Sequence, residues 1–151
     1  MTSHSFKTVV KIPIETVWTF LHSVEDWYKV IPGYISHEIH SEKVSTWQIK
    51  SDFGLIKKKI TFKAEILDWK ELDKISFRMT GISDKFNGRG YIETIKLSNH
   101  KTRIEVAFDL TAEGSMAKLI KPFLKSSLPE MSEEHKVELE QTIKQIAGSV
   151  R

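Results

Sequence analysis

The spacing of apolar residues changes along the chain, and each spacing predicts a different kind of element. Residues 5–12 alternate apolar and polar side chains, which indicates a first strand. Residues 14–22 carry apolar side chains three and four positions apart, which predicts an amphipathic helix. Residues 23–30 predict a second short helix. Pro32 and Gly33 end it, because proline cannot continue the hydrogen-bond ladder and glycine favours a turn.

From residue 34 the apolar period becomes two. We expect strands near residues 34–41, 44–53, 55–69, 74–82, 88–98 and 102–111, separated by short turns. In the third of these strands Ile60, Phe62 and Ile66 share one face, while Lys59 and Glu65 share the other. One apolar and one charged face are typical of an antiparallel sheet that is covered on one side. The short connections favour a meander of neighbouring strands.

After Gly114 the apolar residues return to spacings of three and four, which predicts a long C-terminal helix. Pro122 and Pro129 fall inside this pattern, and each removes a helical hydrogen bond, so we expect a kink or a break there. Ser127 and Glu130 have the spacing of a capping box. Two helices in line and one bent helix therefore fit equally well. Residues 1–151 predict a single α+β domain, in which a curved seven-stranded antiparallel sheet is combined with two short helices and this long one.

Composition narrows the class of protein. The 151 residues include no cysteine, which excludes disulfides and thiolate metal sites. The 23 basic and 20 acidic residues leave a net charge of only +3, too balanced to indicate nucleic-acid binding. No segment approaches the roughly 20 apolar residues that cross a membrane, and the N-terminus lacks the apolar region of a secretion signal. We therefore expect a cytoplasmic protein without a cofactor, a nucleic-acid partner or stable membrane insertion.

Five short segments, in this order and spacing, resemble one superfamily. They are IETVW (residues 14–18), IPG (31–33), GLIK (54–57), GRG (88–90) and EGSMAKL (113–119). With the order of elements, they are similar to the helix-grip, or START-like (SRPBCC), superfamily, and most similar within it to the CoxG family associated with carbon monoxide dehydrogenase. The resemblance implies a fold that grips its C-terminal helix and an apolar cavity that binds lipids, quinones or polyketides. It also implies an association with molybdenum hydroxylases.

Large apolar side chains on the predicted inner face are the strongest functional signal. A bent sheet and one helix do not usually fill the space between them, so such side chains line a pocket for a small molecule. Plain core packing is the alternative. The predicted lining is Trp47, Ile49, Phe53, Ile60, Phe62, Phe77, Met79, Tyr91, Phe108, Met116, Ile120, Phe123, Leu124 and Met131. Candidate polar contacts are Lys58, which falls on the apolar side of its strand, Arg89, and His135 on the apolar stripe of the last helix.

The remaining polar features predict no catalytic set and no metal site. His37 and His40 fall on opposite faces of a strand, so we interpret them as surface histidines. The segment 87–90 enters a strand instead of a helix, which favours a turn and bulge over an anion site. The lysines at 57–59 and at 118, 121 and 125 fit solvated faces, or transient contact with anionic lipid headgroups.

Together these features predict a binder of a small apolar ligand (a lipid, an isoprenoid quinone or an aromatic metabolite) in preference to an enzyme. Two alternatives stay open. One is an accessory protein for a partner enzyme, a molybdenum hydroxylase such as carbon monoxide dehydrogenase. The other is a polyketide cyclase-like enzyme.

Overall fold

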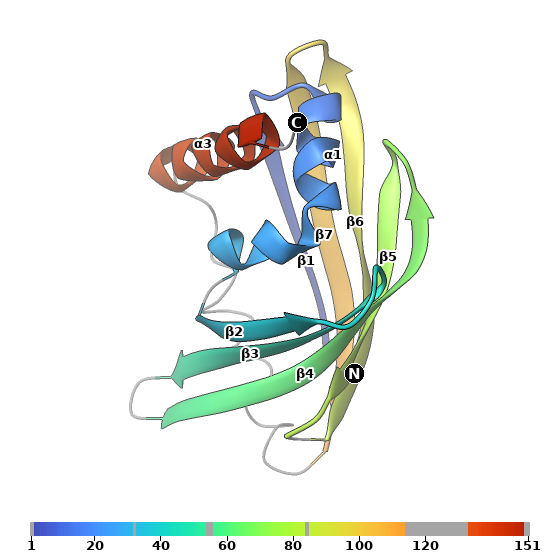
Figure 1. The fold of residues 1–151 in the computed structure, drawn as a ribbon, viewed down its shortest axis with the longest axis vertical. Helices are drawn as coiled ribbons and strands as arrows, with labels where there is room; N and C mark the ends of the chain where they lie inside the picture. The colour runs from blue at the N-terminus through green and yellow to red at the C-terminus, as the bar shows by residue number, and fades with distance from the viewer. Residues whose placement is uncertain (1, 32, 54–55, 84, 114–132, 150–151) are drawn as a thin grey trace.

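The computed structural model describes residues 2–31, 33–53, 56–83, 85–113 and 133–149 (Figure 1). Seven strands, two α-helices and one 3-10 helix follow one another along these residues. In chain order they are β1 (Thr2–Val10), α1 (Ile14–His22), the 3-10 helix η1 (Val24–Val30), β2 (Tyr34–Ile39), β3 (Val44–Phe53), β4 (Ile56–Lys70), β5 (Lys74–Gly81), β6 (Phe86–Ser98), β7 (Lys101–Ala112) and α3 (Glu133–Ser149).

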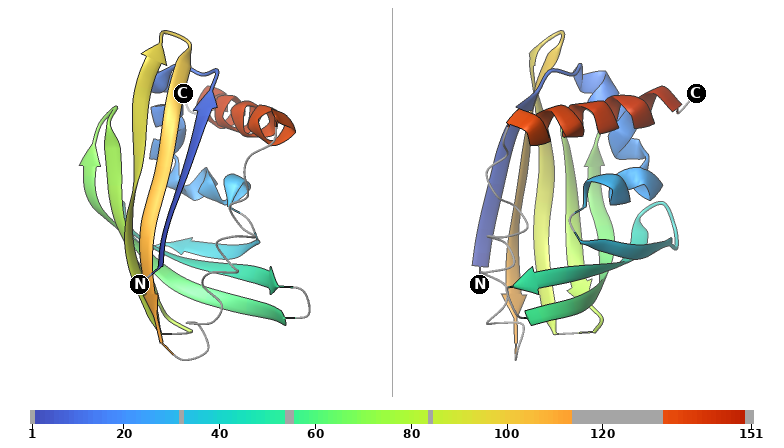
Figure 2. Two further views of the ribbon diagram at one scale, coloured as in Figure 1. Left: turned by 180° about the vertical axis from the view of Figure 1, so that it is seen from behind. Right: turned by 90° about the vertical axis from the view of Figure 1, so that its left-hand side faces the viewer.

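The strands form one antiparallel sheet in the order β1-β7-β6-β5-β4-β3-β2. Strands β2 to β7 are therefore the predicted meander. Strand β1 forms the edge next to β7 and pairs with it from Thr2 opposite Leu110 to Val10 opposite Thr102. The sheet is strongly bent, and α1, η1 and α3 all lie on its concave side (Figure 2). The predicted helix-grip architecture is confirmed.

Most predicted elements are found within two residues of their expected bounds. Helix α1 spans the predicted residues, and its apolar stripe is buried. The first strand runs three residues further toward the N-terminus than expected and ends at Val10, while Ile12, beyond it, is fully buried. The second short helix has 3-10 geometry. The predicted helical break between Pro122 and Pro129 lies outside the described residues.

One end of the concave face is filled by helices, and we call it the helix-packed half. Its core joins the sheet residues Val10 and Ile75 to apolar side chains of α1 and α3. Trp18 of α1 is 1% exposed, and its indole Nε1 donates to Thr94 Oγ1 on β6 at 2.8 Å. Because the indole nitrogen has a partner, the large ring is buried without leaving a polar atom unsatisfied. This half is a conventional protein core.

The turn into β2 depends on Gly33. Its φ of 71° lies in the left-handed region, where side chains other than glycine are strained. A Cβ at this position would lie 2.2 Å from the carbonyl oxygen of Lys50. The Gly33 carbonyl accepts a hydrogen bond from the Lys50 amide at 2.7 Å, so the turn is held against β3. Gly33 thereby sets where β2 begins along the sheet edge.

Candidate functional site

The other end of the concave face carries aromatic and aliphatic side chains, and we call it the aromatic half. It lies at the end of the sheet away from α1 and α3 (Figure 1). Ile49, Ile60, Phe86 and Leu110 form its buried base, and partly buried apolar residues pack around them: Ile31, Phe62, Met79, Phe108 and Ala112. Partly buried apolar residues surround both cores, but among the described residues the aromatic half includes no side chain of α1 or α3.

Strand register brings most of the predicted sheet residues of the cavity onto one face. Trp47 pairs with Phe62, and Ile49 pairs with Ile60. On the next strand pair, Ala64 lies opposite Met79 and Ile66 lies opposite Phe77. Phe108 lies opposite Gly90 on the same face. Directly opposed residues of an antiparallel pair share a face, so the sheet contributes a continuous apolar surface.

Gly88 and Gly90 make room for this surface. They lie inside β6, and the register on both sides of them is unbroken, so the expected turn and bulge at this segment is wrong. A Cβ on Gly90 would lie 2.7 Å from Phe108 Cβ and 2.8 Å from Phe77 Cζ, and one on Gly88 would lie 2.3 Å from Leu110 Cδ2. These glycines are needed so that large neighbours can lie flat against the sheet.

Tyr91 and Arg89 lie on the convex face, so their assignment to the cavity is wrong. Side chains alternate along a strand, and Gly90 and Ile92 occupy the concave side of β6. The Tyr91 hydroxyl donates to Glu105 Oε1 at 2.7 Å, and Lys7 Nζ lies 3.5 Å from Glu105 Oε2. The prediction followed the aromatic character of Tyr91 and overlooked its position in the alternation.

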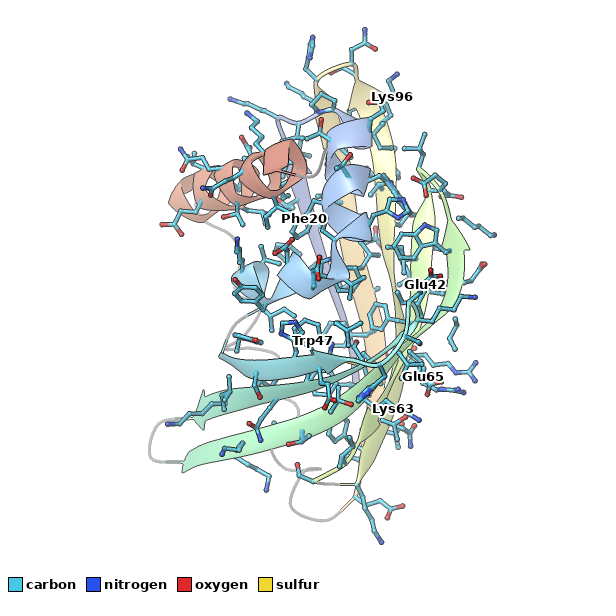
Figure 3. All side chains as sticks on the ribbon, in the orientation of Figure 1. Phe20, Glu42, Trp47, Lys63, Glu65 and Lys96 are labelled. Carbon is cyan, nitrogen blue, oxygen red and sulfur yellow. The ribbon has the colours of Figure 1, made fainter. Side chains whose placement is uncertain are left out.

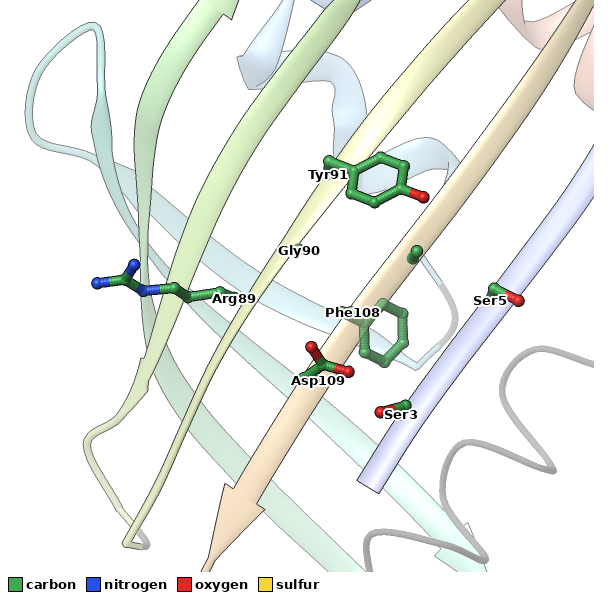
Figure 4. A pocket seen from close by; sticks show the side chains of 8 residues that line it. Ser3, Ser5, Arg89, Gly90, Tyr91, Phe108 and Asp109 are labelled. Carbon is green, nitrogen blue, oxygen red and sulfur yellow. The ribbon is translucent and has the colours of Figure 1, made fainter. Parts of the chain in front are cut away.

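This convex network shifts two pKa values. The hydrogen bond from Tyr91, together with the nearby charge of Lys7, lowers the pKa of Glu105. The same hydrogen bond raises the pKa of Tyr91. The surrounding hollow has a volume of about 240 Å³, and Ser3, Ser5 and Asp109 are among the residues that line it (Figure 4). The hydrogen bond favours the ionised form of Glu105 and the protonated form of Tyr91, as in an ordinary surface network.

The other predicted site residues divide into two groups. Lys58 lies opposite Ser51 on the concave side of β4 and is partly buried, in agreement with its predicted side of the strand. The side chains of Phe53 and His135 are outside the described part of the chain. So are the residues predicted from the start of the last helix: Met116, Ile120, Phe123, Leu124 and Met131.

A cluster of stacked rings beside the aromatic half was missed by the sequence analysis. The His37 ring stacks on Trp47 at a centroid distance of 4.6 Å and an angle of 16°, and on Tyr28 at 5.7 Å and 20°. The Tyr34 hydroxyl lies 2.7 Å from His37 Nδ1. Trp47 itself is 2% exposed, and its indole donates to Ser45 Oγ at 2.8 Å. Figure 3 shows Trp47 on the concave side of β3.

His37 lies on β2 and His40 directly after the end of this strand, and their contacts are on opposite faces, as predicted: His37 with Trp47 and His40 with Thr46. His40 is exposed, and its Nε2 lies 2.7 Å from Thr46 Oγ1. His37 is partly buried within the ring cluster, so its interpretation as a surface histidine is wrong. Alternation alone could not reveal this, because the cover on His37 comes from Tyr28 on η1, a separate element.

A second pocket, of about 520 Å³, opens between α1, the β2–β3 turn and the far end of β4. Its apolar floor is Ile66 and Trp69, and Glu25, Glu42 and Lys43 lie around it. His22 Nε2 lies 2.8 Å from Glu71 Oε2, and Trp69 Nε1 donates to the same oxygen at 3.0 Å. The hydrogen bond from His22 has the largest effect on the pKa of Glu71 and lowers it, and the hydrogen bond from Trp69 lowers it further. The pairing keeps His22 and Trp69 in contact at the pocket edge.

Two classes of feature are not found in the described part of the chain. No group of three or more histidine, aspartate or glutamate side chains is placed there to hold a metal ion. No helix among the same residues is both long enough and apolar enough to cross a membrane.

Comparison with solved structures supports the fold. A conserved protein from Geobacillus kaustophilus is similar at a TM-score of 0.74 and 18% identity, covering 98% of this chain and 97% of that one. A START superfamily protein from Mycobacterium smegmatis is similar at 0.68 and 16%, covering 95% and 98%. The Zhui aromatase/cyclase from a Streptomyces species is similar at 0.62 and 14%, covering 97% and 93%. At these identities the likeness shows the fold alone.

The sequence comparisons add one further result. No protein of curated function is matched by the sequence. One protein-family model matches residues 1–146, nearly the whole chain, and its description says only "-like", without a ligand or a reaction. The chain therefore belongs to the family of that model, and its fold is the helix-grip, START-like fold.

Proposed function

We propose that the protein binds a small apolar molecule, such as a lipid, an isoprenoid quinone or an aromatic metabolite, on the aromatic half of the concave face. One contrast carries the proposal. The core of the helix-packed half includes side chains of α1 and α3, whereas the described cluster of the aromatic half contains none, and its Phe62, Met79 and Phe108 stay partly accessible. Partly accessible large apolar side chains in a concave surface are the usual make-up of a small-molecule site.

The fold supports this ligand class. The similar structures include a START superfamily protein and an aromatase/cyclase. In this chain, Gly88 and Gly90 keep the floor of the site free of side chains and let Phe77 and Phe108 lie along it. A flat apolar floor favours a planar or extended apolar molecule over a compact polar one.

Native mass spectrometry of gently purified protein tests the proposal directly. We expect an additional mass that organic extraction releases and identifies. A neutral fluorescent naphthylamine probe should bind the same surface in competition with this ligand. Phe62→Ala should weaken probe binding about 10-fold, because losing part of an aromatic contact costs about 1.4 kcal/mol. Lys59→Ala, on the opposite face of the same strand, is the matched control and should leave affinity unchanged. Bare protein that binds no apolar probe would overturn the proposal.

An accessory function for a molybdenum hydroxylase, such as carbon monoxide dehydrogenase, is a second candidate. The five segments similar to the CoxG family support it, and its setting would be the cytoplasm. Affinity purification of the tagged full chain from its native host tests it. Recovery of a molybdenum enzyme with the protein is expected. Purification without any large enzyme would count against this function and would leave the ligand proposal standing.

A cyclase-like reaction is a third candidate, and it is supported by the fold shared with an aromatase/cyclase. Two polar residues that could have served it, Tyr91 and Arg89, lie on the convex face. The remaining polar wall of the concave side includes Lys58, Tyr34 and His37. Incubation with a linear aromatic polyketide, followed by mass spectrometry of the products, tests this reaction. A product that forms equally fast without the protein excludes it.

A further inference from the structure

The His37 ring is fixed by contacts on three sides. Trp47 covers one face at a centroid distance of 4.6 Å, and Tyr28 also lies nearly parallel to the ring, at 5.7 Å. Tyr34 Oη occupies the position beside Nδ1. A ring held by two stacked neighbours and one hydrogen bond has little rotational freedom left. Its second nitrogen, Nε2, is therefore presented in one direction.

Nε2 is the polar atom that remains available. No hydrogen bond from the described residues reaches it. The His37 side chain is partly exposed, and Nε2 is not among the buried unpartnered side-chain atoms found in the described part of the chain. A polar atom that is both accessible and immobile is the kind of group that orients a ligand in an otherwise apolar site.

The hydrogen bond with Tyr34 decides whether Nε2 or Nδ1 carries the proton of the neutral imidazole. A neutral imidazole has one donor nitrogen and one acceptor nitrogen, and the partner of one nitrogen sets the role of the other. The phenol is the stronger acid of the pair and the imidazole nitrogen the stronger base. On this ground we assign the Tyr34 hydroxyl as the donor and Nδ1 as the acceptor of the 2.7 Å contact. The proton of the imidazole is then on Nε2, which becomes a donor.

We propose that His37 Nε2–H donates a hydrogen bond to a carbonyl oxygen of the bound apolar molecule, so that the site selects aromatic ketones and quinones over hydrocarbons of the same shape. Tyr34 acts as the positioning residue that holds the required tautomer. This inference rests on the proposed ligand site. It places the polar end of the ligand at β2 and its apolar body along Phe62, which lies next to Trp47 across the β3–β4 pair.

A matched pair of probes isolates this hydrogen bond. Fluorenone and fluorene have nearly the same shape and differ in a carbonyl against a methylene group. We would measure the affinities of both probes for the full-length protein and for His37→Phe, which keeps an aromatic ring between Trp47 and Tyr28. For each protein we would take the ratio of fluorenone affinity to fluorene affinity. Comparing this ratio between the variant and the wild type removes the difference in hydration between the two probes.

We expect His37→Phe to reduce the relative preference for fluorenone about 5- to 15-fold, the equivalent of about one neutral hydrogen bond. Fluorene affinity should stay within about 2-fold, which also shows that the variant is folded. The infrared carbonyl stretch of bound fluorenone should lie at lower frequency in the wild type than in the variant. A purely structural role for His37 would not change this frequency.

The outcomes separate the two proposals. If fluorene and fluorenone bind the wild type but His37→Phe leaves their ratio and the carbonyl stretch unchanged, the role of His37 is overturned and the apolar site stands. If the wild type binds neither probe nor the naphthylamine, both proposals fail. If His37→Phe weakens both probes equally, the ring supports the site only by packing, and the hydrogen bond to a carbonyl is overturned.

Discussion

The two halves of the concave face are built from the same alternating strands but are covered differently. In the helix-packed half, Ile75 of β5 is fully buried beneath α1 and α3. In the aromatic half, Met79 of the same strand, four residues further on, stays partly accessible. The alternation of the sequence is the same at both positions. Along β5, the elements that lie over the strand therefore decide how far an apolar residue is buried.

The stacked rings lie beside the aromatic half and combine features of both halves. Trp47 is as buried as a core residue, and its indole hydrogen is satisfied by Ser45. His37, stacked on it, keeps one nitrogen accessible. A rigid apolar wall with one exposed polar atom is suited to recognition, because little entropy is lost when a ligand binds to it. The contrast between the halves predicts several results.

The largest expected effect is on stability. Ile75→Ala removes a fully buried side chain and should lower the free energy of unfolding by about 3 kcal/mol. Phe62→Ala removes a larger but partly accessible side chain and should cost only about 1.5 kcal/mol, because less of the ring leaves water on folding. Urea denaturation of the two variants measures both values. An equal or larger loss at Phe62 would show that the aromatic half is ordinary core.

Gly90→Ala should have the next largest effect. Its Cβ would meet the Ala107 carbonyl oxygen at 2.4 Å as well as Phe108 and Phe77, so the strand or both rings must shift. We expect a loss of about 2 kcal/mol and weaker binding of the naphthylamine probe. Gly148→Ala is the control, because nothing lies within 4 Å of its added Cβ. Thermal unfolding should show no loss there. A harmless Gly90→Ala would contradict the role of this glycine in shaping the floor.

A smaller effect is expected for Tyr34→Phe. This change removes the hydroxyl beside His37 Nδ1 but keeps the aromatic ring. The imidazole is then free to place its proton on either nitrogen, so the preference for fluorenone over fluorene should fall about 3-fold, less than with His37→Phe. Nitrogen chemical shifts of His37 should show the loss of a single tautomer. An unchanged tautomer with an unchanged preference would remove Tyr34 from the mechanism.

The smallest effect is expected on the convex face. Tyr91→Phe should leave probe affinity unchanged, because Tyr91 points away from the concave surface. It should raise the pKa of Glu105 toward its ordinary value of 4.5, since the hydrogen bond that lowers it is gone. NMR titration of the Glu105 carboxyl measures this shift. A fall in probe affinity would instead return Tyr91 to the ligand site.

The same variant changes the response of stability to acid. A carboxyl with a lowered pKa in the folded state stabilises the protein above its ordinary pKa, and this contribution is lost as the pH falls through the lowered value. Tyr91→Phe should therefore make stability at neutral pH slightly lower and its decline below pH 4.5 less steep. Urea denaturation at neutral and acidic pH tests the sign. A steeper decline would contradict it.

The fold could be predicted closely because its signals are local and repeated. Apolar spacing located α1, and alternation placed Trp47, Ile60 and Phe62 on one face. The errors at Tyr91 and at Gly88–Gly90 have a common cause. The aromatic and glycine residues were interpreted by type, whereas their register with β5 and β7 sets which face they occupy and what space they leave.

The sequence by itself determined the elements, the meander and the apolar face, because these follow from the spacing of apolar residues that are close together along the chain. Only the tertiary structure decided that α1 and α3 contribute side chains to one half of the concave face and not to the described cluster of the other half. It also decided the surroundings of His37. The stacking of Tyr28, Trp47 and Tyr34 around one imidazole joins a 3-10 helix to two strands, and no spacing along the chain encodes such a contact.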